Sequence, residues 1–155
     1  MRRYLPNVRF QGSIHGELSR DPRYAEYRDG SFTTDRYGFR NDKVSGTPLD
    51  VIAVGDSYTM GDDTAQAKTW SALLSERYGL HVYNLGVAGN GPWHELADLI
   101  IEADRLPVKP HGTVVLWTHP GGGGGTVCPV TRWMSSSAIC GCGFKVNPGG
   151  GGGTV

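Results

Sequence analysis

The sequence predicts an α/β fold, a three-layer α/β/α sandwich built on a parallel sheet. Two observations support this prediction: short β-branched apolar runs recur along the chain, and amphipathic helical segments separate them. Strand, helix, strand, helix, strand at this spacing predicts parallel strands joined by right-handed crossovers. In open sheets of this kind, ligands gather at the carboxyl ends of the strands, so functional residues are expected there.

The strands are expected at residues 50–54, 81–85 and 112–117. The first run is apolar without interruption and ends at Gly55, as expected for a strand buried on both faces. The second run ends at Gly86 in the same way.

Apolar residues recur at helical spacing between these strands. In the first helix this face consists of Trp70, Leu73, Leu74 and Tyr78. In the second it consists of Trp93, Leu96, Ala97 and Ile100. Gly79 supplies a left-handed stop after the first helix, and Pro92 suits the first turn of the second.

Length and charge restrict the function classes. A chain of 155 residues is typical of one domain and is long enough to bury a core. The formal net charge is zero, so charge favours neither nucleic acid nor an anionic membrane as a partner. No apolar run is long enough to span a bilayer, and no apolar segment of a signal peptide follows Met1. The compartment stays open.

The composition divides the chain into three parts. Residues 1–30 have no sustained period and predict an irregular, partly packed arm, and residues 31–118 carry the α/β pattern. Residues 119–155 form a Gly/Cys-rich, low-complexity tail. Within this tail, Pro-Gly-Gly-Gly-Gly-Gly-Thr-Val occurs at 120–127 and again at 148–155. Pentaglycine has no side chains to bury, so we expect the tail to be disordered, or to be an artefact of a reading-frame shift rather than a genuine appendage.

The segment Gly55-Asp56-Ser57-Tyr58-Thr59-Met60-Gly61 directly follows the first strand. A serine nucleophile needs an exposed hydroxyl and a nearby backbone donor for the oxyanion that develops, and a tight turn at a strand end supplies both. Asp56 is expected to support this turn by accepting hydrogen bonds from backbone amides. The alternative interpretation is a plain Gly-Asp-Ser turn.

Gly-Asp-Ser-x-Thr-x-Gly after a buried strand resembles the first signature block of the SGNH (GDSL-type) hydrolases. Asn84-Leu85-Gly86-Val87-Ala88-Gly89, after the second strand, is similar to the second block. The resemblance covers residues 31–117. It implies a flavodoxin-like sheet, Ser57 as the nucleophile, and the backbone N–H of Gly89 as an oxyanion donor beside that of Ser57.

The segment Asp35–Asn41 resembles a Gly-Phe-Arg segment found before the nucleophile block in many bacterial members of this superfamily. The resemblance makes Arg40 a candidate contact for an anion or a carbohydrate. We favour the alternative, in which Phe39 packs under the sheet and Arg40 forms a surface salt bridge. Arg3–Asn7 is similar to a segment that follows a membrane anchor in related proteins, which implies an incomplete N-terminus.

Two further blocks of the family are missing. The resemblance implies an Asn after the third strand, but residues 117–122 contain none, and it implies an Asp-x-x-His near the C-terminus, which occurs nowhere. His119, just past the third strand, is a better substitute for the general base by location than His94, although no acidic residue follows Asp104 to orient it.

The resemblance implies cleavage of a lipid or carbohydrate O-acyl ester through a Ser57 acyl-enzyme. Because the base and one oxyanion donor are missing, we expect weak activity or none. No metal or organic cofactor is implied, since Cys128, Cys140 and Cys142 lack a fourth ligand at convincing spacing. Two alternatives stay open: a catalytically degenerate domain that binds a glycan or acyl group, and a carrier for a Gly/Cys-rich peptide module.

Overall fold

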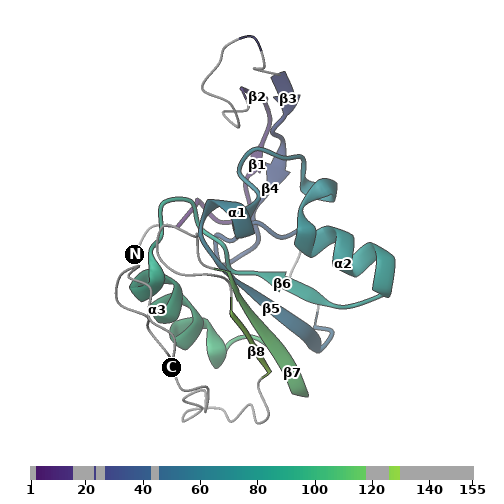
Figure 1. The fold of residues 1–155 in the computed structure, drawn as a ribbon, viewed down its shortest axis with the longest axis vertical. Coiled ribbons are helices and arrows are strands. Elements are labelled where there is room, and N and C mark those ends of the chain that lie inside the picture. Colours follow the sequence, from purple (N-terminus) through teal and green to yellow (C-terminus); the bar gives the residue numbers. More distant parts are fainter. Residues whose placement is uncertain (1–2, 16–22, 24–26, 43–45, 118–125, 130–155) are drawn as a thin grey trace, which may run out of the picture.

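A computed structural model describes residues 3–15, 23, 27–42, 46–117 and 126–129 of the chain. Its central sheet has the strand order β6-β5-β7-β8 (Figure 1). These strands are β5 (Leu49–Gly55), β6 (Val82–Asn84), β7 (Val108–Trp117) and β8 (Thr126–Pro129). The helices are α1 (Ser57–Met60), α2 (Trp70–Tyr78) and α3 (Pro92–Ala103), with a short 3-10 turn η2 (Gln66–Lys68) before α2.

The predicted α/β class is confirmed, because β6, β5 and β7 run parallel with β5 between the other two. The crossovers through α2 and α3 lie on opposite sides of the sheet (Figure 1). In the register of the β5–β7 pair, Gly55 lies opposite Trp117, so both strands end at the same edge. The helix boundaries expected at Gly79 and Pro92 are also confirmed, and Gly79 has the left-handed φ of 65°.

The core is formed mainly by the strands of the central sheet, with Phe39 from the loop before β5 and Leu106 from the segment after α3. It consists of Phe39, Leu49, Ile52, Val54, Tyr83, Leu85, Val87, Leu106 and Val114. Phe39 packs edge-on against Tyr83, with ring centroids 6.2 Å apart. The prediction that Phe39 packs into the interior beside the sheet is therefore confirmed, and this contact anchors the preceding loop to β6.

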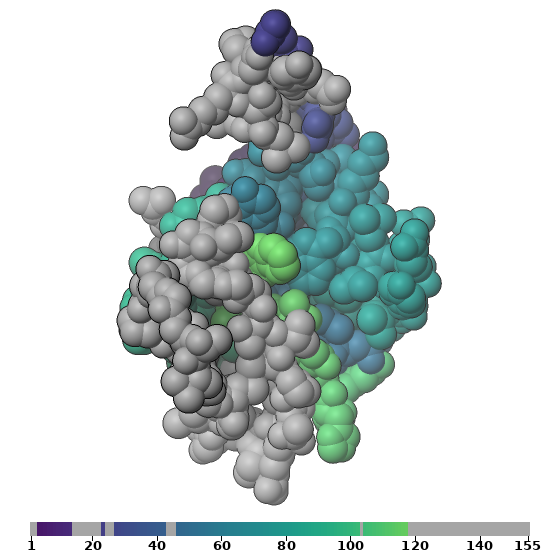
Figure 2. Space-filling view, in the orientation of Figure 1, coloured from purple at the N-terminus to yellow at the C-terminus, as the bar shows by residue number. Residues whose placement is uncertain are grey.

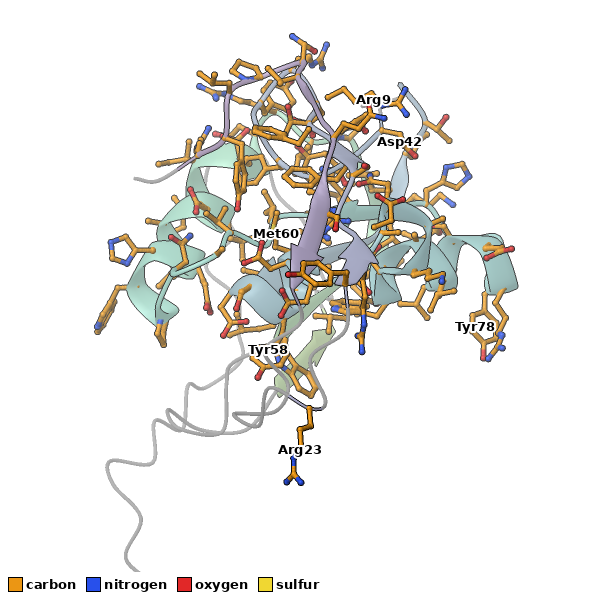
Figure 3. The ribbon with its side chains drawn as sticks, turned by 90° about the horizontal axis from the view of Figure 1, so that it is seen from above. Arg9, Arg23, Asp42, Tyr58, Met60 and Tyr78 are labelled. Carbon is orange, nitrogen blue, oxygen red and sulfur yellow. The ribbon has the colours of Figure 1, made fainter. Side chains whose placement is uncertain are left out.

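Helix α2 turns its apolar face outward. A surface helix usually points such a face toward the core, yet Leu73 and Tyr78 are exposed and the buried residue is Ser71. Figure 3 shows Tyr78 extending from α2 at the periphery of the molecule. A shallow groove of about 350 Å³ runs along this face, lined by Trp70, Leu73, Leu74, Arg77 and Tyr78.

Helix α3 has the same orientation. Trp93 is 83% exposed and Ile100 is 63% exposed. The buried face instead carries the carboxyl groups of Glu95, Asp98 and Glu102. The period of the apolar residues is helical, as expected, but these acidic side chains occupy the interior.

The N-terminal arm was expected to be irregular, and this expectation is wrong for its described part. β1 (Arg9–Phe10) pairs antiparallel with β4 (Phe32–Thr33), and β2 (Ser13–His15) pairs with β3 (Tyr27–Asp29). The β2–β3 pair lies at one end of the molecule, beyond the α/β part (Figures 1 and 2). The aromatic rings of Phe10 and Phe32 stack at 4.7 Å, which stabilises the β1–β4 pair although the sequence shows no period there.

The tail also needs a correction. Residues 126–127 belong to the first glycine repeat and were expected to form no packed element. They instead begin β8, which pairs antiparallel with β7 from Thr113 to Leu116. The edge of β7 presents unpaired backbone groups, and Thr and Val have high β-propensity, so strand pairing is favoured there. The other residues of the tail, Cys140 and Cys142 among them, lie outside the described residues.

Among the described residues, no helix combines the length and the apolar character needed to cross a membrane.

Candidate active site

Ser57 is the first residue of α1, directly after β5 ends at Gly55. Asp56 is the N-cap of this helix, and its carboxylate accepts a hydrogen bond from the Tyr58 N–H at 3.0 Å. This is the kind of turn-supporting bond that the sequence predicts for Asp56. Gly61 ends the helix in the left-handed conformation, with φ of 79°. Ser57 is thus held at the carboxyl edge of the sheet, and it is partly exposed.

The turn after β6 lies against the turn that carries Ser57. The Val87 N–H donates to the Gly55 carbonyl at 3.1 Å, which joins the two turns directly. A side chain at Gly86 would collide with the backbone of Met60 in α1, closer than the 3.0 Å that real Cβ atoms keep. A side chain at Gly55 would collide with Thr59 and with the Trp117 carbonyl in the same way. Glycine at both positions therefore permits the close approach of the two turns.

Asn84 fixes this arrangement from the interior. Its side-chain oxygen accepts from the Gly86 N–H at 2.8 Å, and its amide nitrogen donates to the Thr59 carbonyl at 2.8 Å and to Ser71 Oγ at 3.2 Å. One buried amide thereby connects the end of β6 with α1 and α2. This role was not predicted, since Asn84 stood out only as the first residue of the second block.

The Asp35–Asn41 loop is organised around one buried carboxylate. Asp35 accepts from the backbone N–H of Tyr37 and Phe39, from the Asn41 amide at 2.9 Å and from the Tyr83 hydroxyl at 2.5 Å. Burial, followed by the hydrogen bond to Asp35, raises the pKa of Tyr83 well above its ordinary value. The hydrogen bond between Asp35 and Tyr83 thus holds the loop against β6, and the polar residues of the loop have structural roles.

Arg40 takes neither of the two roles considered for it. Arg40 is only 2% exposed. Its guanidinium group donates hydrogen bonds to the carbonyls of Met60 and Gly61, and to the Thr64 carbonyl at 2.5 Å. Burial lowers the pKa of Arg40 from its ordinary value. The charge caps the C-terminal end of α1 and the loop after it, where carbonyl groups lack helical partners. Arg40 is therefore a positioning residue for the helix that begins at Ser57, and a surface salt bridge is excluded.

Gly89 lies in the turn between β6 and α3. It is exposed and has a left-handed φ of 77°, a conformation that favours glycine. The next residue, Asn90, is buried and donates from its side chain to the Asp98 carboxylate at 2.9 Å. This hydrogen bond fixes the turn to the body of α3, while Gly89 stays accessible at the same edge as Ser57.

A further ionisable side chain is buried next to this edge. Glu95, in the first turn of α3, is 2% exposed, and its Oε2 atom has no hydrogen-bond partner among the described residues. Burial, and then the negative charge of Asp56, raise the pKa of Glu95 to about 7. Glu95 was not among the residues predicted from the sequence. The sequence does contain a sign of it. Glu95 lies three residues before Asp98 and seven before Glu102, which puts all three carboxylates on the helix face opposite the apolar one.

No hydrogen bond joins His94, one of the histidines considered as a base, to Ser57 within the described part of the chain, and the His119 prediction stays untested. His94 is exposed on the first turn of α3, and His119 lies outside the described residues. Among the residues that the structure describes, no group of three His, Cys, Asp or Glu side chains is arranged to hold a metal ion.

Neither the protein-family models, the curated proteins nor the solved structures include a match to this chain. The chemistry must be inferred from the site alone. The site combines a partly exposed serine at a helix N-terminus, an accessible glycine amide on the adjacent turn and a buried carboxyl group beside them. Such a combination suits attack of a hydroxyl on a carbonyl carbon more than redox or metal chemistry.

Proposed function

We propose that this chain is an ester hydrolase domain of the SGNH type, with a flavodoxin-like sheet and Ser57 as its nucleophile. The substrate class is an O-acyl ester of a lipid or a carbohydrate, cleaved through a covalent Ser57 acyl-enzyme. The observation that carries the proposal is the hydrogen bond from the Val87 N–H to the Gly55 carbonyl at 3.1 Å. It brings the turn of Ser57 and the turn of Gly89 together at one edge of the sheet.

In this proposal the ester carbonyl lies between the two turns. The Ser57 hydroxyl attacks the carbonyl carbon, and the backbone N–H groups of Ser57 and Gly89 donate to the oxyanion that forms. The Ser57 N–H belongs to the first turn of α1, where backbone donors lack helical acceptors and a negative charge is favoured. Gly89 is exposed in a left-handed conformation, which supports a close approach of its amide to a substrate.

The proposed activity is slow. The family resemblance implies a third oxyanion donor, an Asn after β7, and none occurs between Trp117 and Gly122. Removing a single oxyanion donor from an esterase-like site costs about 100-fold to 1000-fold in kcat. Reaction with an activated probe is therefore a more suitable test than turnover of a natural ester.

A fluorophosphonate probe tests the proposal, because it phosphonylates activated serines. We expect labelling of the wild-type protein that disappears in Ser57→Ala and persists in Ser75→Ala, a control serine within α2. Circular dichroism establishes that each variant is folded. A folded wild-type protein that stays unlabelled would contradict the proposal and favour a binding domain for glycan or acyl groups. If a peptide of residues 119–155 alone retains an activity measured for the whole chain, the carrier alternative is favoured.

A further inference from the structure

We propose that Glu95 is the proton acceptor for the Ser57 hydroxyl, so that the site operates with a Ser–Glu pair. This inference rests on the proposed function and adds the general base that the sequence does not supply. It stands on a buried carboxyl group whose Oε2 atom has no partner among the described residues, in the first turn of α3, which follows the Gly89 turn.

The first support is the unusual state of the Glu95 carboxyl group. A buried ionisable side chain is normally paired, because leaving it without hydrogen bonds is costly. Asp98 and Glu102, on the same buried face of α3, follow this rule through Asn90 and Arg3. Glu102 also leaves its Oε2 atom without a hydrogen-bond partner, but its Oε1 atom is paired with Arg3. Glu95 is equally buried and forms no ion pair among the described residues, where its Oε2 atom also lacks a hydrogen-bond partner. An acceptor position is therefore available in the first turn of α3.

The second support is the location of Glu95. It interacts electrostatically with Asp56, the residue directly before Ser57. Its backbone N–H donates to the Gly91 carbonyl at 3.1 Å, so Glu95 lies in the first turn of α3, directly after the turn that carries Gly89. The Ser57 hydroxyl makes no hydrogen bond within the described residues, so proton transfer requires a side-chain rotation or one bridging water, as catalytic contacts in unliganded sites often do.

The third support is the proton affinity. The charged group that acts on the Glu95 carboxyl is Asp56 on the adjacent turn, and the titratable residues nearest to Glu95 along α3 are His94 and Asp98. Asp56 opposes ionisation of Glu95, and burial opposes it more strongly, so that its pKa is about 7. A carboxylate with this affinity accepts a proton far better than an ordinary glutamate does, and it is still ionised in part at neutral pH.

The chemical steps balance without a further reactant. The Ser57 proton passes to the Glu95 carboxylate while Oγ bonds to the ester carbon and the carbonyl electron pair moves onto oxygen. When the tetrahedral intermediate collapses, the bond to the alcohol oxygen breaks and the proton passes from Glu95 to that oxygen. Water then attacks the acyl-enzyme, gives a proton to Glu95, and Ser57 leaves with that proton as the free hydroxyl.

The test is the pH dependence of the rate of fluorophosphonate labelling. For the wild type, we expect the rate to rise with pH through a midpoint near 7. In Glu95→Gln the rate should fall by about 100-fold or more, with no step near this pH, because general bases contribute about 100-fold to 10,000-fold. Glu95→Asp should restore part of the rise of the labelling rate with pH. Glu76→Gln, an exposed substitution on α2, should keep the wild-type profile.

Glutamine mimics the neutral carboxyl group, so Glu95→Gln is expected to fold, and thermal unfolding verifies this. A folded Glu95→Gln with the wild-type rate and profile would overturn the inference, as would loss of the step in His119→Ala with the step retained in Glu95→Gln. Labelling that does not depend on Ser57 at any pH would overturn the proposed function itself. The two failures are thus distinguishable.

Discussion

Arg40 and Glu95 are both buried ionisable side chains, and the protein treats them in opposite ways. The guanidinium of Arg40 is matched by carbonyl oxygens of Met60, Gly61 and Thr64, so its charge is retained and used to hold α1. Among the residues that the structure describes, no donor reaches the Oε2 atom of the Glu95 carboxyl group. It is instead held near its neutral form by burial.

This difference predicts how stability depends on pH. The pKa of Glu95 is raised from 4.5 to about 7, so the folded chain binds this proton more tightly than the unfolded chain. The resulting stabilisation is complete below about pH 4.5 and is lost as the pH rises through about 7. One pKa unit corresponds to about 1.4 kcal/mol, so the loss is at most about 3.5 kcal/mol.

Glu95→Gln should remove this dependence and be more stable than the wild type at pH 8. Urea unfolding of both proteins at pH 5 and pH 8 measures the effect, and Glu76→Gln is the exposed control. Equal slopes against pH for wild type and Glu95→Gln would show that this carboxyl group is solvated.

Among the secondary-structure elements, α3 differs most from the pattern in its sequence. Trp93, Leu96, Ala97 and Ile100 do repeat at helical spacing, and α3 does begin at Pro92. The period cannot show which face is buried, because Asn90 and Arg3 compensate the interior carboxylates, and both lie outside the helix, Arg3 far away in the sequence. In contrast, β5 is apolar on both faces, so its burial could be predicted directly.

The orientation of α3 predicts an unequal response to substitution. Ile100→Gln should change the free energy of unfolding by less than about 0.5 kcal/mol, since this side chain is mostly exposed. Leu85→Ala, at a buried position of the core, should lower it by about 2–5 kcal/mol. Chemical denaturation of the two variants checks this. A loss above about 2 kcal/mol for Ile100→Gln would mean that α3 is rotated toward the sheet.

Much of the candidate site could be predicted at this level, and for a clear reason. Ser57, Asp56 and Gly89 follow strand ends, and strand ends are marked locally by glycine after apolar runs. Glu95 and Arg40 could not be assigned, because their roles depend on contacts across the fold. The short strands β1 and β4 were missed because aromatic packing, rather than alternation, holds them. Strands β2 and β3 were missed because strands of three residues are too short to show a period.

For the molecule as a whole, the N-terminal segment is joined to the α/β part by charge and aromatic contacts. Arg3 bridges two buried carboxylates of α3, at 2.8 Å from Glu102 and 3.4 Å from Asp98, and it lies over the Phe39 ring. Tyr4 packs edge-on against Phe10 and Phe32. The arm therefore completes the environment of α3 and of the Asp35–Asn41 loop.

Removing this bridge should destabilise the entire protein. Arg3→Met removes the cation that two buried carboxylates share and leaves Asp98 with Asn90 alone and Glu102 with the half-exposed Arg105, so we expect a loss of about 3 kcal/mol. Arg105 also contacts Glu102, at 3.3 Å, but its side chain is 53% exposed, so Arg105→Met should cost less than about 1 kcal/mol. Thermal unfolding compares the two variants. Equal effects would indicate that the arm is not docked on α3.

The central claim is that a carbonyl group reacts at Ser57. Brief incubation with p-nitrophenyl acetate, acid quenching and peptide mass mapping tests it most directly, because an acyl-enzyme retains the acetyl group. We expect one acetylated site in the peptide that contains Ser57, absent in Ser57→Ala. Acetyl groups found only on lysines or the N-terminus of a folded protein, with Ser57 unmodified, would contradict this account.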